Sequence, residues 1–155
     1  MKRKLSVIIL SFILSYNKLS WASDIGRTSP HPSLSPKQVV KIVMDALKNN
    51  DVPTKNHGVK VTFNFASPAN KKYTGPYERF NNMIWGKTYR PMINHRRATY
   101  EKYKVIGPAA QIDVILISNE GETFGYRFQL SKQFGNSFNG SWMTDSVMPI
   151  GVVTL

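Results

Sequence analysis

The chain has 155 residues, no cysteine and a formal net charge of +12 at pH 7. Without cysteine it forms neither disulfides nor Cys-ligated metal sites, which excludes disulfide-dense secreted modules and cysteine-based zinc domains. The excess of positive charge favours anionic partners, such as carboxylate or phosphate ligands, acidic protein surfaces or nucleic acid, but it does not indicate a fold.

The N-terminus has the pattern of an export signal over residues 1–22. Basic residues at 2–4 precede a short apolar run at 5–14, and Ser20 and Ala22 occupy the small-residue positions that signal peptidase recognises. The run is too short for a membrane span, which needs about 18 apolar residues. We therefore predict cleavage before Ser23, no membrane span afterwards, and export to a periplasm, the extracellular space or an organelle lumen.

Cleavage would remove four basic residues and no acidic one, so the net charge of the mature chain falls from +12 to +8. Residues 23–35 are rich in Pro, Ser and Thr and are predicted to form a flexible leader. Residues 36–150 then have the length of a single domain that can bury a core without disulfides.

A helix over Pro36–Lys48 is the first predicted element. Ser35 stands at the N-cap position, Pro36 at the first helical position, and Gln38, three residues after the cap, completes a capping box. Apolar residues then recur at helical spacing and form a core-facing stripe: Val39, Ile42, Val43, Ala46 and Leu47. We expect this stripe to pack on a sheet that includes Phe128 and Trp142.

The segment Val59–Ala66 is open between two structures. Its apolar residues alternate with polar ones, which favours a strand, but a short helix would also bury two or three of them. Ser67-Pro68 and Gly75-Pro76 predict turns. A second helix is predicted over Pro76–Trp85, with Gly86 as its end.

Four β-rich runs complete the chain: Tyr100–Ile106, Ala110–Ser118, Glu122–Ser131 and Phe138–Val147. The residues Asn119-Glu120-Gly121 between the second and third runs are typical of a hairpin turn. Helices followed by an antiparallel meander predict an α+β domain, in which N-terminal helices pack on a curved antiparallel sheet.

Several motifs occur in order along the chain: Phe65-Ala66-Ser67-Pro68, the stretch 75–80, Tyr89-Arg90-Pro91 and the stretch 140–147. Over about residues 36–150 they resemble an uncharacterised domain-of-unknown-function family that looks like a branch of the nuclear transport factor 2-like, cystatin-like superfold. The resemblance implies a cone of one bent sheet wrapped by helices, often with a pocket in its mouth. Isomerases, dehydratases, ligand carriers and interaction modules share that superfold, so the fold does not specify the function.

Catalytic motifs are not evident: the sequence has no Gly-rich phosphate loop, nucleophile elbow or His-Glu-x-x-His helix. The histidines His31, His57 and His95 lack ligand spacing and are expected to be solvated, so no metal or cofactor is predicted. Asp113 and Tyr126 are weak catalytic candidates, because apolar walls can raise the pKa of a carboxyl enough for a general base. The favoured interpretation is that Asp113 is solvated or paired with a cross-strand Lys or Arg.

Aromatic residues at 124, 126 and 128 share one face of their strand with Leu130, which favours a role in the core, and Trp142 is also expected in the core. The resemblance implies a concave sheet face where core and pocket merge, so Tyr126 and Phe128 could also line a pocket. Asp145, near Trp142, is expected to be solvated or paired, like Asp113.

A basic cluster between helices and strands is the predicted ligand-binding site: Arg90, Arg96 and Arg97, with Tyr89 and Tyr100 nearby. A guanidinium is a planar donor fork suited to carboxylate or phosphate, so a small anion or an acidic protein surface is the predicted partner. Nucleic acid is not favoured, because no nucleic-acid motif is present. For these surface charges a solvated rim is the favoured interpretation, and anion binding is the functional hypothesis set against it.

Two functions are compatible with these residues. A non-catalytic binding or interaction module is favoured, because no acid–base pair is visible in the sequence. The alternative is a small lyase or isomerase that uses a pocket carboxylate or tyrosine.

Overall fold

The structure is a computed structural model, and it describes residues 28–151. The predicted export signal and residues 23–27 of the leader lie outside this range. The rest of the leader contacts the domain: Leu34 is buried, and Asn64 Nδ2 donates a hydrogen bond of 2.8 Å to Thr28 O. None of the helices in the described range is long and apolar enough to cross a membrane.

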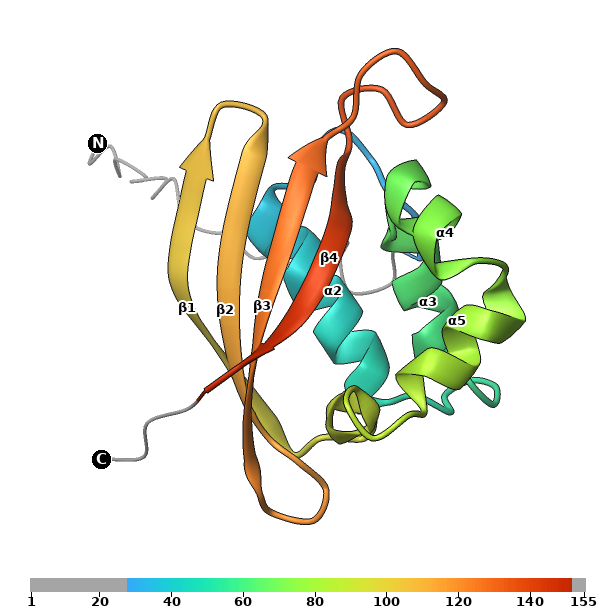
Figure 1. The fold of residues 1–155 in the computed structure, drawn as a ribbon, viewed down its shortest axis with the longest axis vertical. Helices are drawn as coiled ribbons and strands as arrows, with labels where there is room; N and C mark the ends of the chain where they lie inside the picture. Colours follow the sequence, from blue (N-terminus) through green and yellow to red (C-terminus); the bar gives the residue numbers. More distant parts are fainter. Residues whose placement is uncertain (1–27, 152–155) are drawn as a thin grey trace, which may run out of the picture.

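The described residues form an α+β domain (Figure 1). Its helices are α2 (Pro36–Lys48), α3 (His57–Phe65), α4 (Pro68–Thr74), α5 (Tyr77–Ile84) and the 3-10 helix η1 (Arg90–Met92). Its strands are β1 (Arg97–Ile106), β2 (Ala109–Ile117), β3 (Thr123–Lys132) and β4 (Trp142–Ile150), joined as one antiparallel sheet in the order β1-β2-β3-β4.

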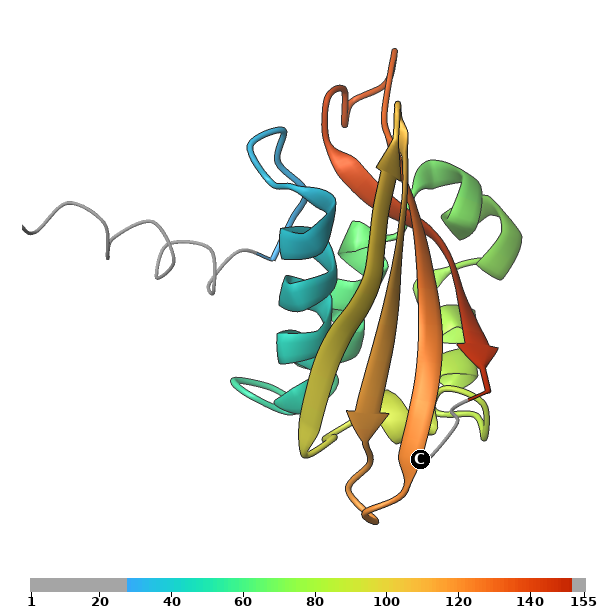
Figure 2. The ribbon, with the colours of Figure 1, turned by 90° about the vertical axis from the view of Figure 1, so that its left-hand side faces the viewer.

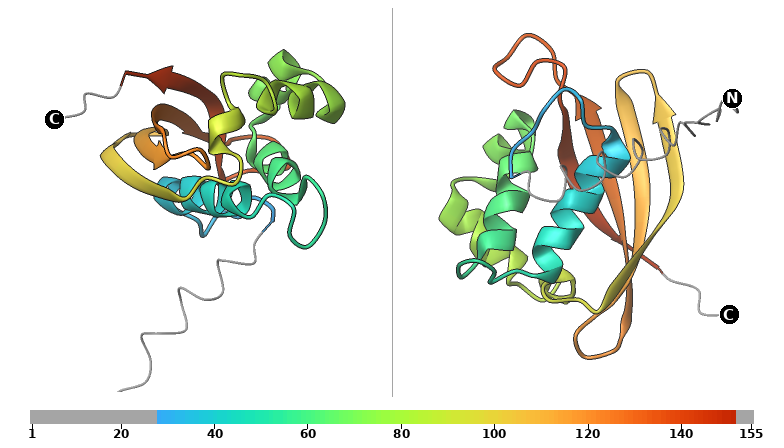
Figure 3. Two further views of the ribbon diagram at one scale, coloured as in Figure 1. Left: turned by 90° about the horizontal axis from the view of Figure 1, so that it is seen from below. Right: turned by 180° about the vertical axis from the view of Figure 1, so that it is seen from behind.

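Helix α2 lies on one face of this open sheet (Figure 2), and α4 and α5 lie beside β4 (Figure 3). The opposite face, in front in Figure 1, carries no helix of the described residues, and we call it the helix-free face. This arrangement confirms the predicted α+β class with helices packed on an antiparallel sheet.

Helix α2 has the predicted bounds and cap. Ser35 N donates to Gln38 Oε1 (2.8 Å), and Gln38 N donates to Ser35 Oγ (3.3 Å), which completes the capping box. The helix stripe packs in one core cluster with Phe128, and Trp142 packs at the margin of this cluster, half-buried. The fully buried members of the stripe are Val39, Val43 and Leu47, whereas Ala46 is partly buried.

The segment that the sequence left open is helical. The start of helix α3 is hydrogen-bonded to Asn50, which follows the end of α2. Asn50 O accepts from Gly58 N (2.9 Å), and Asn50 Oδ1 accepts from Val59 N (3.1 Å). A Cβ on Gly58 would overlap the main-chain oxygen of Ala46. The two helices therefore touch backbone to backbone at a glycine.

Helix α4 lies where only a turn was predicted. Pro68 occupies its first turn, and Ser67 Oγ accepts from Asn70 N (3.2 Å), so Ser-Pro starts this helix as it starts α2. Ser67 N also donates to Thr144 O (2.8 Å), and Ala66 forms an isolated bridge with Thr144. These contacts attach the helix to β4. Helix α5 agrees with its prediction to within a residue at each end.

Strands β2 and β3 match their predictions to within one residue, whereas β1 starts three residues earlier. Strand β4 begins at Trp142, later than the predicted 138, because residues 133–141 form a closed loop. Gln133 N donates to Ser141 O and Gly140 N donates to Gln133 O, each at 2.8 Å. The predicted aromatic stripe does face the core, where Tyr126, Phe128 and Leu130 are buried.

Candidate functional site

A cavity of about 140 Å³ lies between the helices and the β3–β4 side of the sheet. Helices α2, α3, α4 and α5 contribute to its wall, together with β3, β4 and the segment around η1. Most of the wall is apolar, including Val43, Leu47, Phe80, Ile84, Phe128 and Val147. An engineered apolar cavity of about 150 Å³ binds benzene, so this space admits a single ring.

The polar groups of the wall are mostly bonded within the protein. Thr62 Oγ1 donates to Gly58 O (2.8 Å), and Tyr89 Oη donates to Val147 O (3.0 Å). Burial raises the pKa of Tyr89, so its hydroxyl is neutral at neutral pH. The hydroxyl of Thr144 is different: it is buried and has no hydrogen-bond partner among the described residues.

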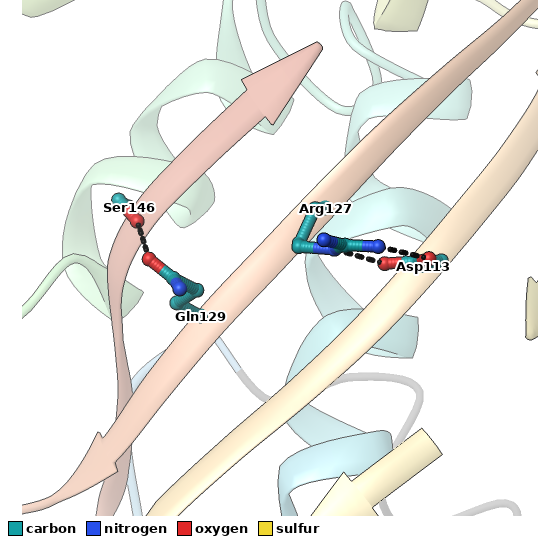
Figure 4. Close-up of polar contacts among 4 residues, drawn as sticks. All are labelled: Asp113, Arg127, Gln129 and Ser146. Carbon is teal, nitrogen blue, oxygen red and sulfur yellow. Dashed lines mark hydrogen bonds and ion pairs between the residues drawn. The ribbon is translucent and has the colours of Figure 1, made fainter. Parts of the chain in front are cut away.

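Asp145 is the one acidic residue among those that line the cavity. Its Oδ1 accepts a hydrogen bond from Ser131 Oγ (3.0 Å). Ser131 lies opposite Ala109 in the β2–β3 pair, and its side chain is on the helix-free face. The carboxylate is therefore directed away from the cavity. Ser146 also bonds on that face, where its hydroxyl donates to Gln129 Oε1 (2.8 Å; Figure 4).

Asp113 and Tyr126, the catalytic candidates, lie on opposite faces of the sheet. Asp113 accepts two hydrogen bonds from Arg127, at 2.7 and 2.8 Å, on the helix-free face (Figure 4). Tyr126 faces the helices, where its hydroxyl donates to Thr88 O (2.8 Å) and burial raises its pKa to about 12. The two side chains therefore share no site, and of the two states expected for Asp113, solvated or paired across strands, the structure shows the pair.

A carboxyl that acts as a general base needs a raised pKa, whereas this pairing lowers the pKa of Asp113. The hydrogen bonds from Arg127 hold the pKa of the carboxyl below its ordinary value of 3.8, although burial acts in the other direction. Asp113 is only 1% exposed, so removing Arg127 would leave a buried carboxylate without the guanidinium that donates two hydrogen bonds to it.

Replacing Arg127 with methionine is expected to destabilise the protein and to weaken its acid dependence. Because the folded pKa of Asp113 lies below the unfolded one, the pair stabilises the fold fully above the unfolded value and loses this effect as pH falls through the folded value. Urea unfolding at about pH 7 and about pH 2.5 measures the difference between wild type and variant, which should shrink in acid. Lys104→Met, on exposed β1, is the control; an equal difference at both pH values would contradict the assignment.

The residues predicted to bind an anion do not form one cluster. Arg96 Nε and Nη2 both donate to Asn119 O, at 3.0 and 2.6 Å, so this guanidinium holds the β2–β3 turn. Arg97 begins β1 and Arg90 begins η1, and both are exposed. No hydrogen bond or ion pair joins these three side chains.

The two tyrosines of the predicted cluster point into the domain. Tyr89 lines the cavity, and its ring stacks on that of Tyr126 with 6.4 Å between centroids. Tyr100 packs against the core from β1, where burial raises its pKa. Both tyrosine side chains therefore lie in the interior, separate from the exposed arginines.

The prediction that the histidines are solvated is wrong for His95. This residue is 3% exposed, and its Nδ1 lies 2.8 Å from Met92 O, with which it forms a hydrogen bond. Burial lowers its pKa and keeps the ring neutral at neutral pH. His31 is exposed, as expected, and His57 is half-buried at the start of α3. Across residues 28–151, His, Asp and Glu form no group that could hold a metal ion.

The resemblance implied a pocket, and Phe128 was a possible lining residue, but the rest of the wall was not predicted because it combines side chains from segments far apart in the chain. One signal could have indicated Thr144: it is a polar residue next to Met143 in a β-rich run, and it is buried in β4. Its main chain contacts Ala66 and Ser67, which directly precede α4, a helix that was not predicted.

The class that these features define is an α+β domain whose open antiparallel sheet and flanking helices enclose a small, mainly apolar cavity. The family described as Domain of unknown function (DUF4864) matches residues 33–150, and the chain belongs to this family. No curated protein and no solved structure matches the chain.

Proposed function

We propose that this protein is a non-catalytic binding protein that holds a small, mainly apolar ligand in the cavity between its helices and its sheet. The observation that carries the proposal is the cavity of about 140 Å³, enclosed on several sides by buried apolar side chains. Transfer of an apolar ligand from water into such a site is favourable, and ligand pockets are typically apolar with few polar groups.

The arrangement of charged groups favours binding over catalysis. A catalytic pocket needs ionisable side chains that converge on one point. Here the carboxylate of Asp145 bonds to Ser131, and Asp113 pairs with Arg127 on the helix-free face. Neither acid is placed to exchange a proton with a ligand in the cavity.

The relation to the nuclear transport factor 2-like superfold is part of this proposal. Helices packed on an open antiparallel sheet, with a cavity between them, support it. Export after cleavage before Ser23, and an anionic or acidic partner near Arg90, Arg96 and Arg97, stay predictions.

Filling the cavity should abolish binding without unfolding the protein. Toluene, observed by NMR titration, is the probe, and Val147→Phe is the variant, because Val147 lines the cavity. The added ring should occupy the space and remove saturable binding of toluene. Met148→Phe is the matched control, because Met148 is the next residue and is exposed.

Wild type and Met148→Phe should bind toluene alike, and both variants should keep the wild-type fold by circular dichroism. Saturable binding that persists in Val147→Phe, or its absence from the wild type, would overturn the proposed function.

A further inference from the structure

The hydroxyl of Thr144 is a buried polar group with an unmet hydrogen bond. Thr144 is 6% exposed and lines the cavity, yet its Oγ1 has no partner among the described residues. Most buried polar groups in proteins are hydrogen-bonded, and an exception calls for a physical reason. A partner that arrives with the ligand supplies that reason.

The main chain of Thr144 is held firmly, so a loosely packed strand does not explain the unpaired hydroxyl. Its carbonyl oxygen accepts from Ser67 N (2.8 Å) and from Asn70 Nδ2 (3.1 Å). Both donors belong to the start of α4 and fix the residue at the wall of the cavity. The hydroxyl therefore occupies a defined position from which it can donate or accept one hydrogen bond.

The charge of the wall favours an uncharged ligand. No Lys, Arg or His is among the residues that line the cavity, and the carboxylate of Asp145 is directed toward Ser131. A buried charge without a counter-charge is strongly unfavourable. An anion would therefore find no partner, and a cation would find no carboxylate facing it.

We infer that the ligand of this cavity is an uncharged, single-ring molecule with one oxygen that hydrogen-bonds to Thr144 Oγ1. The volume of about 140 Å³ sets the size, the apolar wall selects the ring, and the unpaired hydroxyl selects the oxygen. This inference rests on the proposed function, since it names the chemical class of ligand for the same cavity.

Phenol and toluene test this inference, because they differ only in a hydroxyl against a methyl group. Their dissociation constants are measured by NMR titration for the wild type and for Thr144→Val, a substitution that keeps the shape and removes the hydroxyl. We expect the preference for phenol over toluene to fall about three- to tenfold in the variant, the usual effect of one hydrogen bond. The variant should also melt at a higher temperature, because a buried unpaired group is gone.

Thr62→Val is the matched control. Thr62 also lines the cavity, but its hydroxyl already donates to Gly58 O (2.8 Å), so the preference for phenol should stay as in the wild type. If both probes bind and Thr144→Val leaves the preference unchanged, the inference is overturned while the proposed function stands. If neither probe binds the wild type, the proposed function fails and the inference fails with it.

Discussion

Replacing Gly58 with alanine is expected to lower the free energy of unfolding by about 3 kcal/mol, at the upper end of the usual cost of overpacking. In an ordinary helix interior the same change stabilises by about 1 kcal/mol. Here the new Cβ would overlap Ala46 O, and it would lie 2.7 Å from Ala46 C and 3.0 Å from Asn50 Cα. All three atoms belong to the main chain of α2 and the residues after it, so the overlap cannot be relieved by rotation of a side chain.

Urea unfolding of the variant measures this effect. Gly151→Ala is the control, because a Cβ at that position meets nothing within 4 Å. It should change the stability by less than about 0.5 kcal/mol, as surface substitutions usually do. An unchanged or raised stability in Gly58→Ala would show that α2 and α3 are not in close contact.

Replacing Asn50 with alanine is expected to cost about 2–4 kcal/mol, because several hydrogen bonds end on this one side chain. Asn50 is 0% exposed. Its Oδ1 accepts from Val59 N (3.1 Å), and its Nδ2 donates to Asp51 Oδ1 (3.0 Å). Without the side chain, the amide of Val59 at the start of α3 stays buried and loses its partner.

Asn49→Ala is the matched control for this substitution. Asn49 is exposed, and its side chain makes a local bond to Asp45 O (3.2 Å). Its loss should cost less than about 1 kcal/mol in chemical unfolding. Equal effects at the two asparagines would contradict the role assigned to Asn50 in joining the helices.

The contact between α2 and α3 also explains why the structure of Val59–Ala66 could not be predicted from its own residues. Alternating apolar positions at Val59, Val61 and Phe65 fit a strand as well as a helix, and nothing local decides between them. The decision comes from Asn50 and from the close approach at Gly58, which are tertiary contacts. In contrast, α2 carries its own cap and stripe, so its bounds were predicted correctly.

The candidate site was harder to predict than the fold for a related reason. Charge density singled out the arginines, but sequence proximity does not show that Arg96 binds the Asn119 carbonyl or that Tyr100 points into the core. The cavity depends on where α4 and α5 lie relative to β4, and α4 was not predicted. Ser67-Pro68 carried the same signal as Ser35-Pro36, but without an apolar stripe to follow it.

The two outer strands of the sheet have a consequence for how the protein behaves in crowded solution. Strand β1 is broken by a bulge between Glu101 and Lys104, and Lys102 takes a φ of 45° there. Strand β4 has an irregularity opposite Gln129 and ends near Pro149, which has no N–H to donate. Irregular, charged or proline-bearing edges resist pairing with a strand of another molecule. These edges therefore disfavour the addition of a further strand from a second copy of the chain.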